Sequence, residues 1–363
     1  AVNKYLLKIS KIKTKPINKE LHSFYITIIF GFFLIGFFSV LPIITNYTSQ
    51  IIFNAKLIDN TSKIDFEKTL SGKEIIKNND TESDSLALRN LFDDVFEFES
   101  SPSDAIRLNA TLIEQLFEDT GYNLNKVRKN KVVKPVSLSL LPGEIKNIQN
   151  TKKKKELFIQ IVLPLILEEN NLITLDRKKL FVILNKNNNS KREIKWLNSK
   201  FKQYGVVKKD LSTLKIRMDI VPASLAIAQA AKETGWGTSR FAIEGNALFG
   251  QWTWSDEGIK PSAASDDTSH KVMKFKVLKA SVRAYQRNLN THPSYREFRK
   301  IRAEQRDREE KLNSLELVKY LDKYAATGKK YTDVIKKIIE QNSLTDFDDA
   351  YLLPISKKIK NLI

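Results

Sequence analysis

The stretch that decides the fold covers residues 221–254 and reads VPASLAIAQAAKETGWGTSRFAIEGNALFGQWTW. Pro222 suits the first turn of a helix, where its missing N–H costs no hydrogen bond. Half of the residues in 223–232 are alanine, and small side chains let a helix pack closely against its neighbours. Gly235 and Gly237 end this helix because glycine accepts the positive φ angles of C-caps and tight turns. We therefore expect a central, buried helix.

Glu233 falls in the last turn of this predicted helix. The negative end of the helix dipole disfavours a carboxylate there by about 0.3–1 kcal/mol. Desolvation by Trp236 and apolar neighbours also raises the pKa of a carboxyl group. A carboxyl group that stays protonated near neutral pH can give its proton to a leaving oxygen, as in glycoside hydrolysis. The alternative is a structural glutamate that pairs with Lys232, Arg240 or another base.

Five segments carry a resemblance to a known family. QAAKETGWGTSRFA and GNALFGQWTW resemble the glucosaminidase domain of peptidoglycan hydrolases, most closely its Bax-like members (a mannosyl-glycoprotein endo-β-N-acetylglucosaminidase-like family). The similarity continues through SVRAY at 281–285, NLNTHPSY at 288–295 and YAATGKKY at 324–331. It covers about residues 121–342, more weakly at the start. The family usually has serine where this chain has Thr234.

The resemblance implies a mainly α protein with a lysozyme-like α-lobe and a small β-lobe over a substrate groove. It implies that Glu233 is the general acid, and that the enzyme cuts the β-1,4 bond after N-acetylglucosamine. It also places Tyr324 near that bond, although a hydrogen-bonding core tyrosine is the alternative. Phe249, Trp252 and Trp254 are expected to stack on sugar faces. The candidate substrate-binding residues are Trp236, Asn246, Phe249, Gly250, Gln251, Trp252, Trp254 and Tyr331.

The second catalytic group is not identified by the sequence. An inverting hydrolase needs a base about 6.5–9.5 Å from the acid, and a retaining one a nucleophile about 5–5.5 Å away. Many relatives have a glutamate on the β-lobe, but Lys271 and Lys274 stand where we expect an acid. Either a displaced carboxylate serves, or the N-acetyl group of the substrate acts as the nucleophile. The displaced candidates are Asp256, Glu257, Asp266 and Asp267.

An apolar segment near the N-terminus predicts a membrane anchor. Residues 24–44 form a run of 21 residues without a charge, and such a helix spans roughly 30 Å, the thickness of the hydrocarbon core. Six lysines precede the run, and residues 45–54 contain no Lys or Arg. The positive-inside rule then places the start of the chain in the cytoplasm and the rest in the periplasm, as a single-pass inner-membrane protein. A cleaved signal peptide is the alternative.

The rest of the chain divides by composition. We expect a cytoplasmic basic segment at 1–22, an anchor at 23–44, a polar stalk at 45–103 and a helical module at 104–205. The catalytic domain follows at 206–345. A basic tail follows at 346–363, and we expect it to be disordered; a membrane contact is the alternative. Within the module, 104–120 has helical periodicity, with Ile106 and Leu112 among its apolar positions. Residues 132–141 read as extended. Residues 156–170 predict a buried helix that is kinked at, or starts near, Pro164.

Composition limits the partners. The net charge of +19 favours an anionic partner such as acidic lipid or a wall polymer, although a general lysine bias explains it equally well. No nucleic-acid-binding motif is recognised, so we expect glycan strands and the membrane as partners, and no nucleic acid. The chain has no cysteine, and its three histidines lack metal-ligand spacing. We expect no metal and no cofactor.

Two other functions fit the same residues. A lytic transglycosylase also uses one glutamate in a lysozyme-like groove, and its products differ from those of a hydrolase. A non-catalytic wall-binding scaffold is the second alternative, because the second carboxylate has no assigned position.

Overall fold

The computed structural model describes residues 106–253, 258–259 and 271–354. All of them belong to one compact unit, Asn78–Ile363. The predicted basic segment, membrane anchor and stalk lie outside the described residues. So do Trp254, the four candidate carboxylates Asp256, Glu257, Asp266 and Asp267, the side chain of Trp252, and residues 355–363.

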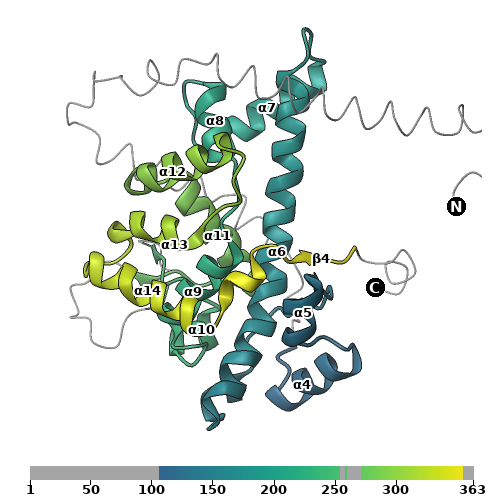
Figure 1. Ribbon diagram of the computed structural model, residues 1–363, viewed down its shortest axis with the longest axis vertical. Helices are drawn as coiled ribbons and strands as arrows, with labels where there is room; N and C mark the ends of the chain where they lie inside the picture. Colours follow the sequence, from purple (N-terminus) through teal and green to yellow (C-terminus); the bar gives the residue numbers. More distant parts are fainter. Residues whose placement is uncertain (1–105, 254–257, 260–270, 355–363) are drawn as a thin grey trace, which may run out of the picture. The chain divides into compact units, whose positions relative to one another are not determined.

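The described residues are mainly helical, as predicted (Figure 1). The α-helices are α4 (Ala110–Asp119), α5 (Leu124–Asn130), α6 (Thr151–Leu184), α7 (Lys191–Gln203), α8 (Leu211–Arg217), α9 (Ala223–Thr234), α10 (Arg240–Gly245), α11 (Leu278–Thr291), α12 (Arg296–Asp307), α13 (Ser314–Leu317) and α14 (Lys329–Gln341). Short 3-10 turns are η2 (Gly143–Asn147), η3 (Pro293–Tyr295), η4 (Val318–Tyr320), η5 (Asp322–Tyr324) and η6 (Leu344–Phe347). The strands are β1 (Val132–Val133), β2 (Trp252–Thr253), β3 (Lys271–Val272) and β4 (Tyr351–Leu352).

The longest element is α6, a single helix of 34 residues that runs through Pro164. Of the two alternatives for this helix, a start near Pro164 is therefore wrong, and a kink there stays a prediction. The helix begins at Thr151, where the side chain of Asn150 accepts a hydrogen bond from the backbone N–H of Lys153 and caps the first turn. Among the described residues, α6 alone is long and apolar enough to cross a membrane, and 67% of its apolar window is buried inside the protein. That burial agrees with the predicted core helix.

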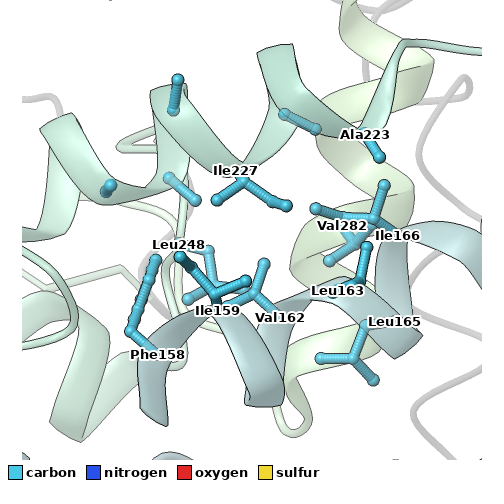
Figure 2. Close-up of a cluster of buried hydrophobic side chains, with 14 of the residues drawn as sticks. Phe158, Ile159, Val162, Leu163, Leu165, Ile166, Ala223, Ile227, Leu248 and Val282 are labelled. Carbon is cyan, nitrogen blue, oxygen red and sulfur yellow. The ribbon is translucent and has the colours of Figure 1, made fainter. Parts of the chain in front are cut away.

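The predicted central helix is α9, and ten of its twelve residues are buried. It packs against α6, α14 and η6. Figure 2 shows the contact with α6, where Ile227 faces Ile159 and Val162. Gly235 ends α9 in the left-handed conformation, as predicted, with its N–H bonded to the carbonyl of Ala231. The start of α9 has no cap from Pro222. Instead, Asp348 accepts hydrogen bonds from the backbone N–H (2.8 Å) and the hydroxyl (2.7 Å) of Ser224.

The two small sheets join distant parts of the chain. Strand β1 pairs in parallel with β4, with Val132 opposite Tyr351, so most of the predicted extended segment 132–141 is not strand. Phe347 and Ala350 are buried in the core. The expectation of a disordered tail from residue 346 is therefore wrong as far as residue 354. Strand β2 pairs antiparallel with β3.

The predicted helical module and catalytic domain share one hydrophobic core. The core includes Ile113 and Leu157 from the first segment and Ile227, Leu289 and Ile339 from the second. A smaller cluster lies at the far end of α6, around Leu180 and Phe201. Two predicted apolar contacts of the first helix are wrong, because Ile106 is 82% exposed and Leu112 is 54% exposed. The helix starts only at Ala110, which leaves Ile106 outside it.

Candidate active site

Glu233 lies where the buried helix α9 meets a sharp turn. The next residues Gly235, Trp236 and Gly237 all have positive φ angles, of 58°, 61° and 83°. A left-handed conformation is uncommon for tryptophan, and strain of this kind clusters at functional sites. Gly237 is required for packing as well, because a Cβ atom there would lie 2.9 Å from the ring of Phe158. The turn therefore fixes the direction in which the chain leaves Glu233.

Burial raises the pKa of the Glu233 carboxyl group above its ordinary value. A hydrogen bond from Tyr331 and the positive charge of Lys232 oppose this shift without cancelling it. The direction agrees with the one predicted from the sequence. The side chain is only half-buried, so the carboxyl group can still reach a ligand.

A chain of hydrogen bonds connects Glu233 to the core. The hydroxyl of Tyr285 donates to Oε1 of Gln229 (2.6 Å), and Nε2 of Gln229 donates to the hydroxyl oxygen of Tyr331 (3.0 Å). Because the hydroxyl oxygen of Tyr331 accepts this hydrogen bond from Gln229, its O–H group is left to donate to Glu233. Both tyrosines and Gln229 are almost fully buried. The network therefore holds Glu233 in one position.

Sequence reasoning missed Gln229 and Tyr285. Gln229 precedes Glu233 by four residues, so the two side chains share one face of α9. A glutamine among buried alanines was the available signal, since a buried amide needs hydrogen-bond partners. For Tyr285, the only signal in the sequence was its place within the SVRAY match.

Gly250 brings the backbone against the Glu233 carboxyl group. A Cβ atom on Gly250 would lie 3.1 Å from Oε2 of Glu233, and the φ angle of Gly250 is 61°. Both features require glycine at this position. Gly250 thus lines the site directly beside Glu233. The sequence predicted it only as one of several substrate-binding residues.

Tyr324 and Phe249 belong to a cluster of aromatic rings beside Glu233. The hydroxyl of Tyr324 donates to the carbonyl of Phe249 (2.9 Å), and its ring stacks on Tyr331 at 5.5 Å. This hydrogen bond is the core role set out above as the alternative for Tyr324. The ring of Phe249 stacks on Tyr285 at 3.8 Å and is 1% exposed. The expected stacking of Phe249 on a sugar is not possible from this buried position.

Asn246 also points inward. It ends α10 with a left-handed φ of 50°, and its Nδ2 donates to the carbonyls of Phe275 (2.9 Å) and Lys276 (3.1 Å). At 4% exposure it ties two chain segments together. This placement gives Asn246 a structural role and no direct path to a substrate.

Trp236 and Gln251 lie at the borders of the site. Phe158 meets the Trp236 ring in an edge contact at 5.9 Å, and Nζ of Lys155 lies 4.9 Å from the ring centroid. The backbone carbonyl of Gln251 accepts from the N–H of Met273 (2.8 Å), which joins the segment after Gly250 to the second sheet. The buried Oε1 of Gln251 has no hydrogen-bond partner.

No group of three or more acidic or histidine side chains is placed to hold a metal ion within the described ranges. The predicted second acids lie outside those ranges. The described site thus offers one carboxyl group with a raised pKa, a tyrosine that donates to it, and a glycine wall. A carboxyl group of this kind is what a glycoside hydrolase requires of its general acid.

Comparisons with known proteins agree with this class. The family model for mannosyl-glycoprotein endo-beta-N-acetylglucosaminidase, the glucosaminidase model, matches residues 208–344. Protein bax of Escherichia coli (strain K12) is 33% identical over 210 residues, which are 56% of this chain and 75% of that protein. No solved structure matches. The chain belongs to the glucosaminidase family, as a Bax-like member.

Proposed function

We propose that this protein hydrolyses the glycan strands of peptidoglycan as an endo-β-N-acetylglucosaminidase. It cuts the β-1,4 bond after N-acetylglucosamine, in a groove between a lysozyme-like α-lobe and a small β-lobe that includes β2 and β3. The observation that carries the proposal is the raised pKa of Glu233, at the end of a buried helix inside the matched family domain. A protonated carboxyl group is what the departing sugar oxygen needs.

In the proposed reaction, Glu233 gives its proton to the glycosidic oxygen as the C–O bond breaks. The carboxylate left behind is stabilised by the Tyr331 hydroxyl and by the charge of Lys232. Water then adds to the anomeric carbon and loses a proton, to the second carboxylate in an inverting reaction or back to the Glu233 carboxylate in a retaining one. Activation of that water, or capture of the cation-like sugar, falls to one of the acids at 256, 257, 266 or 267, or to the substrate's N-acetyl group.

We place the enzyme at the inner membrane, with residues 23–44 as the anchor and the catalytic unit in the periplasm. The uncharged run at 24–44 and the six lysines before it support this placement.

The test is digestion of purified sacculi by the full chain and by Glu233→Gln. We expect the variant to lose at least about 10²-fold in release of reducing-end N-acetylglucosamine, the low end of general acid catalysis. Glu244→Gln is the matched control, since this glutamate is exposed on α10, pairs at 3.9 Å with Arg240, and lies in the same domain.

Mass spectrometry of the products separates the alternatives. Reducing-end N-acetylglucosamine supports the hydrolase. Anhydro-muramic ends would assign the chain to the lytic transglycosylases, and sacculus binding without soluble product would make it a scaffold. Unchanged turnover in Glu233→Gln contradicts the role of Glu233.

A further inference from the structure

One end of the molecule carries a strong excess of positive charge. Residues 176–217, which include the end of α6, α7 and α8, contain 13 Lys or Arg and three Asp or Glu. This segment of 42 residues therefore has a net charge of +10, more than half of the +19 of the whole chain. Figure 1 shows α7 and α8 beside the upper end of α6, away from α10, which follows Glu233. A general lysine bias does not explain charge that is gathered at one end.

Five of these 13 cations take part in the packing of the segment. They pair with acids or donate to backbone carbonyls: Arg177, Lys186, Lys200, Lys215 and Arg217. The three acids are used as well, two of them in those pairs and Asp210 as the N-cap of α8. The other eight cations are exposed, and none of them pairs with an acid in the described part of the chain. Their charge is open to an external anion.

Helix α7 presents a row of these cations on one face. Its inner face packs on α6 through Leu197 and Phe201. Lys191, Lys195 and Lys202 are exposed, and intervals of four and seven residues put them together on an outward face. Two further exposed lysines, at 208 and 209, follow in the turn before α8.

Exposed aliphatic side chains accompany these cations. Val207 is 90% exposed directly before Lys208 and Lys209, and Ile194 is 49% exposed next to Lys195 on α7. Six of the ten large hydrophobic side chains that the described residues expose lie between positions 172 and 211. Cations around exposed aliphatic groups are typical of surfaces that contact lipid, where the aliphatic groups enter the boundary between head groups and acyl chains.

The aromatic rings of the segment are not available for stacking. Nζ of Lys179 lies 4.6 Å and Nζ of Lys200 lies 5.6 Å from the ring centroid of Trp196. Two cations lie over Phe181 in the same way, and the other two rings of the segment are buried. Sites for single-stranded nucleic acid and for sugars depend on exposed rings. The surface therefore fits lipid head groups better than it fits nucleic acid or a glycan.

We propose that the outward face of α7 and the turn at 204–210 contact an anionic lipid surface. The lysines at 191, 195, 202, 208 and 209 bind the phosphates of the head groups. Ile194 and Val207 enter the boundary of the acyl chains. This contact is independent of the proposed glycan cleavage, because it uses none of the residues around Glu233.

The test uses the full chain with one introduced cysteine, which is unique because the sequence has none. Val207→Cys carries an environment-sensitive fluorophore, and the chain is reconstituted into vesicles with brominated acyl chains. We expect quenching in phosphatidylcholine mixed with phosphatidylglycerol, and little in phosphatidylcholine alone. Quenching should decrease in about 1 M salt, where the screening length is about 3 Å. Because the label reports its own surroundings, the readout does not depend on how the rest of the chain is held to the vesicle.

Leu112→Cys with the same label is the matched control. Leu112 is also an exposed aliphatic residue, at 54%, but it lies on α4, toward the other end of α6 (Figure 1). A label at this position should show little quenching in either kind of vesicle.

Loss of charge gives a second measurement on the chain labelled at 207. Lys208→Gln together with Lys209→Gln should weaken the contact about 30-fold, from the usual contribution of two basic residues near an anionic surface, and so remove most of the quenching. Lys126→Gln together with Lys129→Gln is the control, because both lysines are exposed on α5. This pair of changes should leave the quenching unchanged.

Three results overturn the proposal: equal quenching at 207 and 112, equal quenching in the two kinds of vesicle, or full quenching after the loss of Lys208 and Lys209. A label at 207 that responds to purified sacculi and not to vesicles also overturns it, and makes the wall polymer the partner. The labelled side chain at 207 is 90% exposed, so its replacement leaves the core intact and each result can be interpreted.

Discussion

The backbone of Gly250 lies against the carboxyl group of Glu233, so closely that a Cβ atom at Gly250 would be 3.1 Å from Oε2. This contact links the segment after α10 to the end of α9. It leaves the carboxyl group no room on that side. The position of Glu233 is therefore set by the chain on one side and by the hydroxyl of Tyr331 on another.

We predict that Gly250→Ala displaces the Glu233 carboxyl group and lowers turnover of sacculi. The matched control is Gly121→Ala. Gly121 has nearly the same φ angle, 66° against 61°, but a Cβ atom there would meet nothing within 4 Å. Both changes should cost about 1–2 kcal/mol of stability through the left-handed backbone. Only Gly250→Ala should also lose activity, and equal activity in the two folded variants would contradict the contact.

Tyr331→Phe should shift the pH dependence of turnover. The reaction needs protonated Glu233, so the rate falls as pH rises through its pKa. The Tyr331 hydrogen bond lowers that pKa, and its removal should move the basic limb to higher pH. Turnover at the optimum should fall roughly ten- to a hundredfold, equivalent to about 1.5–3 kcal/mol for one hydrogen bond to a charged group.

Tyr122→Phe is the control for that change. Tyr122 is equally buried, at 3% exposure, and its hydroxyl has no hydrogen-bond partner. Its replacement should leave the pH profile unchanged. A basic limb that moves to lower pH in Tyr331→Phe, or stays where it is, would contradict the hydrogen bond to Glu233.

The end of α9 was the part most open to prediction. Gly235 and Gly237 stop the helix for local reasons that the sequence states, and the position of Glu233 follows from them. The network around Glu233 was not predictable in the same way. Gln229, Tyr285 and Tyr331 come from three helices, and which hydroxyl reaches which amide depends on packing.

Aromatic residues were the least reliable sequence evidence for positions that bind sugar. Phe249 and Trp236 have the same side-chain chemistry for sugar stacking, but Phe249 is buried against Tyr285 whereas Trp236 is only half-buried. Local sequence does not encode this difference, because Tyr285 lies 36 positions away in the printed sequence. The local sequence around Pro164 likewise does not show that the helix continues there, because the surrounding core keeps α6 helical through this proline.

The cap of α9 by Asp348 should affect stability in a pH-dependent way. Burial raises the pKa of Asp348 from 3.8 to about 6. The folded state then binds a proton more tightly than the unfolded state. The stabilisation from this proton is fully present below about pH 3.8 and is lost as pH rises through about 6. We expect the stability of the unchanged chain, relative to Asp348→Asn, to increase as pH falls from 7 to 4.

Urea unfolding at several pH values measures that difference. Asp333→Asn is the control, because Asp333 is exposed on α14, pairs with Lys329 on the surface and is not among the groups that shift the pKa of Asp348. The prediction fails if the gap between the unchanged chain and Asp348→Asn narrows, or does not change, on acidification.

Asp219→Asn should destabilise the fold more than any other change considered for α9 and its surroundings. Asp219 is 2% exposed and lies among three arginines, Arg177, Arg302 and Arg306. These charges hold the pKa of Asp219 well below its usual range. Removal of the carboxylate leaves Arg302, which is fully buried, without its compensating charge. Breaking a buried pair in this way costs about 3–5 kcal/mol.

Asp333→Asn is the matched control, since Asp333 pairs with Lys329 on the exposed surface of α14. An exposed pair four residues apart contributes only about 0.3–0.5 kcal/mol. Urea unfolding should therefore separate the two variants by several kcal/mol. Equal unfolding midpoints would show that the arginine cluster does not depend on Asp219, and the charge of Arg302 would then need another source of compensation. Strong acidification should also lower the free energy of unfolding of the unchanged chain. The stabilisation by ionised Asp219 is present above the pKa of Asp219 in the unfolded state, and it disappears as pH falls through the lower pKa of the folded state.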